Sequence, residues 1–253
     1  MIVLPMAGRS SRFTKAGYKT PKYRLPLHGS SVLEHVINSF KNYYNTETFL
    51  FITLKSDQNK AFIQECCHTV GLSTSNYLIC ELDAPTSGQA ETIAYGIRQQ
   101  NIPLKQPLII FNVDTFRPGF TLPEVTKDPK LQGYLEVFKG EGEGWSFVDP
   151  GPNNKAMRVT EKVRISDLCS TGLYYFKHIE LFLRLFERIE NTPSGELQGG
   201  EKYVAPLYNH LIKAGSDVRY EVVAIKDVIF CGVPDEYEAL LNSDESIFSF
   251  SRT

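Results

Sequence analysis

The chain has 253 residues, a formal net charge of −2 and 42% hydrophobic residues. This length is enough to bury a full core, and we expect a single α/β domain over residues 1–253. The nearly balanced charge argues against general nucleic-acid binding, which favours a basic face. No apolar run approaches the roughly 18 residues that cross a bilayer. We therefore expect neither a nucleic-acid partner nor a membrane partner.

The N-terminus and the cysteines favour a cytoplasmic protein. The first residues lack the basic segment and the small-residue cleavage site of a secretory signal. The cysteines are odd in number and show no Cys-x-x-Cys spacing, which favours reduced, mostly buried thiols over a disulfide or a zinc site. They are Cys66, Cys67, Cys80, Cys169 and Cys231.

The chain begins with a segment that is typical of phosphate binding. Ile2–Met6 reads as an apolar strand, and it breaks into the small residues of 7–11. Such a loop leaves backbone N–H groups free for a phosphate chain. A plain strand-to-helix turn would explain Gly8, but it would not explain the positive charges of Arg12 and Lys22. We therefore predict a nucleoside triphosphate site at this loop.

Apolar runs alternate with amphipathic ones through the next part of the chain. This alternation predicts βαβ units and a parallel sheet, in which ligands bind beyond the carboxyl ends of the strands. The loop after Met6, the segment at Gly88 and Asp114 should therefore meet at one edge. The expected strands are Phe49–Leu54, Tyr77–Leu82 and Leu108–Val113, and the expected helices are Gln58–Val70 and Gly88–Gln100.

The pattern changes after Asp114 to shorter strands with polar turns. We expect a mixed or antiparallel extension that holds a second substrate. Two polar stretches, 139–144 and 191–200, are predicted to be mobile loops, and each is a candidate lid. The expected strands are 133–138, 145–148, 156–161, 172–176 and 219–225, and the expected helices are 179–189 and 202–214.

Six short motifs, in order along nearly the whole chain, resemble those of the sugar-phosphate nucleotidyltransferases. This family includes nucleoside-diphosphate-sugar pyrophosphorylases and cytidylyltransferases of cell-envelope synthesis. The motifs are Met6–Phe13 with Gly17-Tyr18 and Pro21-Lys22, then Ser87–Ala90, Asn112–Asp114, Glu161-Lys162, Ser170–Tyr174 and Gly232–Pro234.

The resemblance implies a fold and a separate half of the chain for each of the two substrates. The fold is a Rossmann-like α/β nucleotidyltransferase (glycosyltransferase-A-like) fold, with a mixed, mainly parallel sheet flanked by helices. Residues 1–116 would form the nucleotide-binding half and residues 117–253 the acceptor-binding half.

The resemblance also assigns roles to individual residues. Arg12, Lys22 and Lys162 would be catalytic through positioning and charge neutralisation. Glu161 would contact the acceptor and Lys162 its phosphate, although a solvated surface pair is the alternative. Acceptor-binding residues would be Glu161, Lys162, Thr171, Gly172 and Tyr174. Nucleotide-binding residues would be Met6, Ala7, Gly8, Arg9, Ser10, Ser11, Arg12, Lys22, Ser87, Gly88, Gln89, Asn112 and Asp114.

Within this set, the segment Ser87–Ala90 would read the edge of the nucleobase, because a helix N-terminus presents free N–H groups. A simple N-cap by Ser87 is compatible with that role.

A carboxylate at Asp114, after a very apolar strand, must face solvent, a cation or a metal. The resemblance implies that Asp114 holds Mg²⁺ on the triphosphate; a turn cap is the alternative. For Asn112 a structural role is favoured.

Two positions depart from the family pattern. Ser10 stands where a second glycine is usual, so the loop is less permissive of a positive φ, although the hydroxyl is available to a phosphate. Phe230 stands where many members carry a second metal-binding carboxylate, two residues before Gly232. Asp227 is the alternative source of that ligand. Other branches of the family also lack the carboxylate, so the departure does not predict an inactive protein.

The predicted reaction is attack by an acceptor phosphate oxygen on the α-phosphorus of a nucleoside triphosphate, with release of pyrophosphate. A phosphomonoester is largely dianionic near neutral pH, with a second pKa of about 6. No general base is therefore needed, and none of the five histidines has ligand spacing.

The choice of substrates rests on a further resemblance to the capsule-synthesis branch. It favours CTP and a small phosphorylated acceptor such as phosphoglutamine. The alternative within the class is a UTP- or dTTP-dependent sugar-1-phosphate nucleotidyltransferase. The alternatives outside it are a non-catalytic nucleotide sensor and a glycosyltransferase, whose Asp-x-Asp motif is missing at Asp114-Thr115-Phe116. A homo-oligomer is compatible with the sequence.

Overall fold

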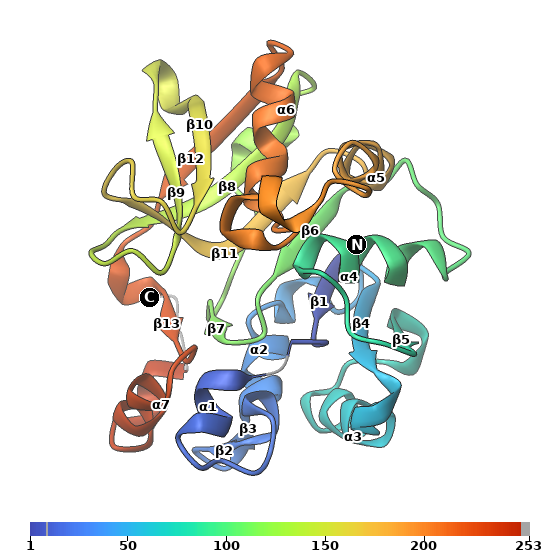
Figure 1. The fold of residues 1–253 in the computed structure, drawn as a ribbon. Coiled ribbons are helices and arrows are strands. Elements are labelled where there is room, and N and C mark those ends of the chain that lie inside the picture. The colour runs from blue at the N-terminus through green and yellow to red at the C-terminus, as the bar shows by residue number, and fades with distance from the viewer. Residues whose placement is uncertain (9, 249–253) are drawn as a thin grey trace.

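The computed structural model describes residues 1–8 and 10–248. Its centre is a nine-stranded mixed sheet with the strand order β10-β9-β11-β6-β1-β4-β5, in which β8 also pairs with β11 and β12 pairs with β8 (Figure 1). The strands β6, β1, β4 and β5 are parallel to one another. They are β1 (Ile2–Pro5), β4 (Phe49–Leu54), β5 (Tyr77–Leu82) and β6 (Leu108–Phe111).

The second half of the chain extends this sheet mainly through antiparallel pairs. The long strand β11 (Leu168–Phe176) pairs antiparallel with β8 on one side, and on the other side with β9 near its start and β6 near its end, so one sheet runs through both halves. The remaining strands are β8 (Leu131–Lys139), β9 (Ser146–Pro150), β10 (Ala156–Glu161) and β12 (Asp217–Val222). The predicted fold class and the predicted antiparallel extension are confirmed.

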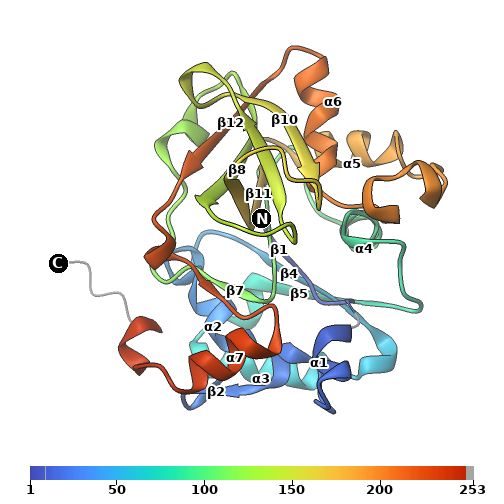
Figure 2. The same ribbon diagram turned by 60° about the vertical axis from the view of Figure 1, so that its left-hand side comes forward.

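Helices cover both faces of the sheet (Figures 1 and 2). They are α1 (Ser11–Lys15), α2 (Val32–Asn38), α3 (Lys60–Val70), α4 (Gln89–Arg98), α5 (Ile179–Glu187), α6 (Tyr208–Lys213) and α7 (Pro234–Leu241). Two small two-stranded antiparallel pairs lie outside the main sheet. They are β2 (Pro26–Leu27) with β3 (Ser30–Ser31), and β7 (Thr115–Phe116) with β13 (Ile229–Phe230).

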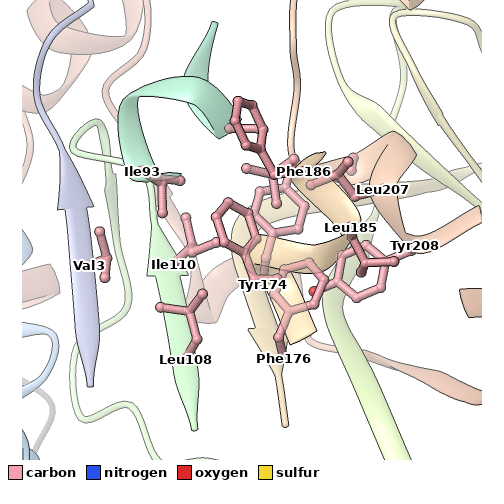
Figure 3. Packing of buried hydrophobic residues seen from close by; sticks show 14 of the residues in the cluster. Val3, Ile93, Leu108, Ile110, Tyr174, Phe176, Leu185, Phe186, Leu207 and Tyr208 are labelled. Atoms are coloured by element: carbon pink, nitrogen blue, oxygen red, sulfur yellow. The ribbon is translucent and has the colours of Figure 1, made fainter. Parts of the chain in front are cut away.

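The apolar strands divide their side chains between two cores. Successive residues of a strand point to opposite faces, and an apolar strand therefore suits a sheet that is covered on both sides. Val3 and Ile110 belong to the core with α4 and α5, where Ile93 and Phe186 lie close by (Figure 3). The neighbours of Val3 and Ile110 along the strands point to the other core, which includes α2 and α3.

Most predicted element bounds agree with the structure. Phe49–Leu54, Tyr77–Leu82 and 156–161 match their strands, whereas the strand predicted at 172–176 begins earlier, at Leu168. The prediction of a helix over 202–214 is wrong for its first part. The α-helix begins only at Tyr208, after a short 3-10 turn that contains Pro206, because proline lacks the N–H group that continues a helix.

The expectation for the thiols is confirmed: all five cysteines are free and buried. Among the described residues, no helix combines the length and the apolar character that crossing a membrane requires.

Candidate active site

A cleft of about 980 Å³ lies beyond the carboxyl ends of β1 and β6. Its walls come from the loop after β1, the segment before α4, the end of β6, and residues of β10 and β11. The parallel topology therefore brings the predicted segments to one edge of the sheet, as expected from the strand-helix alternation.

Nearly all predicted site residues that the structure describes line this cleft. From the nucleotide set they are Met6, Ala7, Gly8, Ser10, Ser11, Arg12, Lys22, Ser87, Gly88, Gln89, Asn112 and Asp114. From the acceptor set they are Glu161, Thr171, Gly172 and Tyr174. Arg9 lies outside the described residues. Lys162 is not among the lining residues; it follows Glu161 and donates a hydrogen bond to the hydroxyl of Tyr203, which does line the cleft.

The opening loop turns sharply at Ser10. This serine adopts φ 46° and ψ 35°, the left-handed conformation that glycine prefers, and its side chain does not cap α1. For a residue other than glycine this conformation costs roughly 1–2 kcal/mol. The serine thus takes the backbone shape expected of a glycine and adds a hydroxyl to the cleft wall. Arg12 is exposed and makes no ion pair within the described part of the chain.

Lys22 and Asp114 form an ion pair in the cleft. The ammonium of Lys22 donates to Oδ2 of Asp114, and both side chains are mostly buried. Gly232 lies against this carboxylate, since a Cβ on Gly232 would be 3.2 Å from the Asp114 Oδ2 atom. Glu236 lies on the same side, where its Oε2 accepts the N–H groups of Gly232 at 2.7 Å and Val233 at 3.2 Å. The Asp114 carboxylate therefore faces the Lys22 ammonium, and the missing side chain of Gly232 leaves room for the carboxylate.

The residues around Asp114 show how many protein ligands a magnesium ion could find there. Within residues 1–8 and 10–248, no group of three or more His, Cys, Asp or Glu residues could hold a metal. Phe230 lines the cleft and packs against Phe138 and Trp145, with ring centroids 4.9 Å away in each case. Asp227 is not among the described lining residues, which argues against it as the replacement ligand. The site therefore fits a hard cation that takes few protein oxygens and keeps water and phosphate ligands.

The segment before α4 differs from its expected form. The N-cap residue is Gly88 and no side chain caps the helix, so the alternative of an N-cap by Ser87 is wrong. The reason is that Glu91 reaches back to accept the Ser87 N–H at 2.5 Å, while the Ala90 N–H donates to the Lys202 carbonyl at 2.8 Å. Among the described residues, no partner takes the N–H groups of Gly88 and Gln89. These two remain for a ligand.

Asn112 connects this segment to β11. Its Oδ1 accepts from the Gln89 side chain at 2.7 Å, and its amide lies close to Gly172, where a Cβ would be 2.7 Å from the Asn112 Cγ atom. Gly172 also has a positive φ of 87°, which favours glycine. Asn112 therefore acts mainly as a structural link between the two walls of the cleft.

Glu161 lies in a buried polar group on the wall of the same cleft. The Ser146 hydroxyl donates to its Oε2 and is 2.9 Å from the Tyr174 hydroxyl. Glu161 is only 8% exposed, so the alternative of a solvated Glu-Lys pair is wrong for the glutamate. Burial raises the pKa of the Glu161 carboxyl above its ordinary value.

Thr171 lines the same cleft, but its side chain is almost completely buried. It is 1% exposed, and its hydroxyl donates to Oε1 of the buried Glu136 at 3.0 Å. The hydroxyl is therefore used in packing and is a poor candidate for contacting an acceptor.

The sequence reasoning missed several residues that line the cleft. They come from the turn before β9, from the chain before α6 and from the start of α7, none of which carries a phosphate-binding pattern. The signals nearby are the predicted loops 139–144 and 191–200, which end just before Trp145 and Glu201. The missed residues include Trp145, Ser146, Glu201, Tyr203 and Glu236.

Comparison with solved structures shows the relationship. The chain is 44% identical to the nucleoside-diphosphate-sugar pyrophosphorylase from Vibrio cholerae RC9, with a TM-score of 0.90, over 96% of this chain and 100% of that one. It shares the fold of a protein described as a glucose-1-phosphate thymidylyltransferase from Bacillus anthracis, at 16% identity, a TM-score of 0.73 and coverage of 97% and 98%. It also shares the fold of the inositol-1-phosphate CTP transferase from T. maritima, at 11% identity, a TM-score of 0.70 and coverage of 98% and 92%.

No family model and no curated protein sequence matches the chain. The first relative is nevertheless similar over nearly all of this chain and all of its own, and its identity is far above the range in which only the fold is shared. The six motifs along the chain agree with this relationship. The chain therefore belongs to the nucleoside-diphosphate-sugar pyrophosphorylase family of sugar-phosphate nucleotidyltransferases.

Proposed function

We propose that this nucleotidyltransferase uses CTP and a small phosphorylated acceptor, with phosphoglutamine as the favoured candidate, in capsule or cell-envelope polysaccharide synthesis. The observation that carries the reaction is a single cleft whose lining includes both the Lys22–Asp114 ion pair and the buried Glu161. Residues 1–116 supply the nucleotide side of this proposal and residues 117–253 the acceptor side. The proposed location is the cytoplasm, which the free, buried thiols support.

The proposed step is an in-line displacement. A phosphate oxygen of the acceptor forms a bond to the α-phosphorus of the nucleotide, and the bond from that phosphorus to the pyrophosphate oxygen breaks. The acceptor phosphate attacks as a dianion, so no protein base removes a proton. Arg12, Lys22 and Lys162 contribute by positioning the two phosphates and by neutralising their charge.

Magnesium is part of the proposal because Asp114 fits it. The Asp114 carboxylate is 18% exposed in the cleft, and a hard cation with few protein ligands would share it with phosphate and water. When bound, Mg²⁺ would neutralise charge on the triphosphate. Lys22 holds the Asp114 carboxylate in place and offers a second positive charge to the same phosphates.

The choice of CTP and phosphoglutamine is supported by the resemblance to the capsule-synthesis branch. A sugar-1-phosphate acceptor with UTP or dTTP is the second candidate. The Vibrio cholerae relative is described as a nucleoside-diphosphate-sugar pyrophosphorylase, which favours this second candidate. Both candidates use the same chemistry at the α-phosphorus, so the substrates alone separate them.

The test measures pyrophosphate release with each nucleoside triphosphate, Mg²⁺ and a panel of acceptors that includes phosphoglutamine and hexose 1-phosphates. Release with CTP and phosphoglutamine would support the proposal. Release only with UTP or dTTP and a hexose 1-phosphate would refute it in favour of the second candidate. Consumption of a finished nucleotide sugar would indicate a glycosyltransferase, and nucleotide binding without turnover would indicate a sensor.

Binding can be followed separately from turnover. Trp145 is the one tryptophan in the sequence, and it lies on the cleft wall against Phe230. Its fluorescence should therefore change when a ligand enters the cleft.

A further inference from the structure

Residues 198–203, which we call the strap, run between the Glu161-Lys162 motif and the start of α4. The orange chain that leads into α6 lies beside α4 in Figure 2. At one end of the strap, Gln198 Oε1 accepts the backbone N–H of Glu161 at 2.8 Å. At the other end, the Tyr203 hydroxyl accepts a hydrogen bond from the Lys162 ammonium. The strap therefore contacts both residues of the Glu161-Lys162 motif.

Lys202 joins the strap to the nucleobase segment. Its N–H donates to the Ser87 carbonyl at 2.9 Å, and its carbonyl accepts the Ala90 N–H at 2.8 Å. Its ammonium pairs with Glu91 at 2.5 Å, and both side chains are less than a tenth exposed. Gly88 permits this close approach, since a Cβ on Gly88 would lie 2.6 Å from the Lys202 nitrogen. Lys202 therefore fixes the strap against the start of α4 through both its backbone and its side chain.

Lys162 itself is held in an unusual conformation. Its φ of 54° lies in the left-handed region, which costs roughly 1–2 kcal/mol for a residue other than glycine. Its N–H donates to the Trp145 carbonyl at 2.8 Å, and its ammonium lies 4.6 Å from the centre of the Tyr203 ring. A lysine side chain otherwise samples many rotamers, with an entropy worth about 2 kcal/mol. The contacts with Tyr203 therefore hold the ammonium beside a residue that lines the cleft.

We propose that Tyr203 is a positioning residue for the transfer reaction: it holds the Lys162 ammonium for the acceptor phosphate, and Lys202 ties that position to the nucleobase segment. This inference rests on the proposed role of Lys162. It extends that role because none of the six family motifs includes residues 198–203. Tyr203 acts through Lys162, and the proposal gives it no contact with the reacting atoms.

The first test removes only the hydroxyl. Tyr203→Phe keeps the ring and should raise the KM for the acceptor about threefold to tenfold, which is the effect of one lost hydrogen bond. The KM for the nucleotide should stay within about twofold, because the lysine serves the acceptor. Tyr44→Phe is the matched control: its hydroxyl bonds Asn38, and Tyr44 is not among the described residues that line the cleft. An unchanged acceptor KM, or an equal rise in both KM values, would overturn the proposal.

The second test is a double-mutant cycle with Lys162→Ala. If Tyr203 acts through Lys162, adding Tyr203→Phe to Lys162→Ala should change the acceptor KM no further. Effects that simply multiply would show that Tyr203 acts independently, and the proposal would then be wrong. The melting temperature of each variant separates this result from a loss of folding.

The third test needs no substrate. Partial burial lowers the pKa of Lys162, but the hydrogen bond to Tyr203 and nearby carboxylates raise it more, so the net direction is upward. The titration of ¹³C-methylated Lys162, assigned by its loss in Lys162→Arg, can be followed by NMR. Tyr203→Phe should shift it to lower pH, and Tyr44→Phe should leave it in place.

These readouts separate the inference from the proposed function. Failure of every nucleotide and acceptor to release pyrophosphate would refute the proposed function while leaving the Lys162 titration measurable. A Lys162 titration unmoved by Tyr203→Phe would refute the inference, whichever substrates the enzyme turns over.

Discussion

The Lys22 ammonium is hydrogen-bonded to the Asp114 carboxylate, although the two residues are 92 positions apart in the chain. The pair joins the turn after α1 to the end of β6 and sets one positive and one negative charge side by side in the cleft. Each residue keeps the other from being an unpaired charge in a mostly buried position, which would be costly. The same two groups are therefore already side by side in the cleft where we propose that the triphosphate and its cation bind.

Asp114→Asn should reduce kcat by about 100-fold or more, because it removes the charge that would hold the cation while keeping the shape of the side chain. Nucleotide binding should change much less, since Arg12 and the free N–H groups of Gly88 and Gln89 remain. Steady-state kinetics and calorimetric titration of the nucleotide measure the two effects.

Asp227→Asn is the control for that experiment. Asp227 is close to Phe230 in sequence but is not among the described residues lining the cleft, so activity should be unchanged. A loss as large as that of Asp114→Asn would mean that Asp227 supplies a cation ligand after all.

Ser10→Gly and Ser10→Ala separate the backbone of the opening loop from its hydroxyl. Glycine should stabilise the protein by about 0.5 kcal/mol, the relief of left-handed strain less the entropy that glycine loses on folding. Alanine keeps the strain and should not stabilise. If the hydroxyl contacts the triphosphate, both variants should raise the nucleotide KM by a similar factor. Denaturant unfolding and kinetics give the two quantities, and an unchanged KM in both variants would exclude that contact.

The buried Glu161 carboxyl predicts a pH dependence of stability. Its folded pKa lies above the ordinary value of 4.5, so between those two pKa values the folded protein binds more protons than the unfolded chain. Stability should therefore fall as pH rises through this window. Glu161→Gln lacks the titration, and its stability relative to the natural protein should be higher at neutral pH than below pH 4.5.

Glu196→Gln is the matched control, because it removes the same charge from an exposed loop position. Urea unfolding at several pH values compares the two variants. A pH dependence that is the same in both variants would contradict the assigned burial effect.

Removing one partner of the buried Lys202–Glu91 pair should destabilise the protein strongly. Lys202→Met leaves the Glu91 charge without its partner and should cost about 3 kcal/mol. The double variant Lys202→Met/Glu91→Met removes both charges and should recover part of that loss. Thermal unfolding measures both.

The exposed pair Lys127–Glu124 provides the comparison, with side chains 73% and 85% exposed. Lys127→Met should change stability by less than about 1 kcal/mol, as is usual for a surface pair. If Lys202→Met were equally mild, the strap would not be anchored by this ion pair.

Much of the fold could be predicted because its signals are local. The alternation of apolar strands with amphipathic helices predicted the parallel part of the sheet, and the change after Asp114 predicted the antiparallel extension. Where local signals conflict with a helical pattern, the prediction failed. The chain over 202–207 holds Pro206 in a short 3-10 turn, and the backbone of Lys202 bonds Ser87 and Ala90 instead of continuing a helix.

The sequence by itself determined the loop of mostly small residues after the first strand, the order of the six motifs and most of the elements that carry them, because strand and helix periods and backbone chemistry are properties of neighbouring residues. Only the tertiary structure decided which charges meet. The partnership of Lys22 with Asp114, the closure of the α4 N-terminus by Lys202 and the hold of Tyr203 on Lys162 all join distant segments. Such contacts depend on how the chain packs across the sheet, and no local period encodes them.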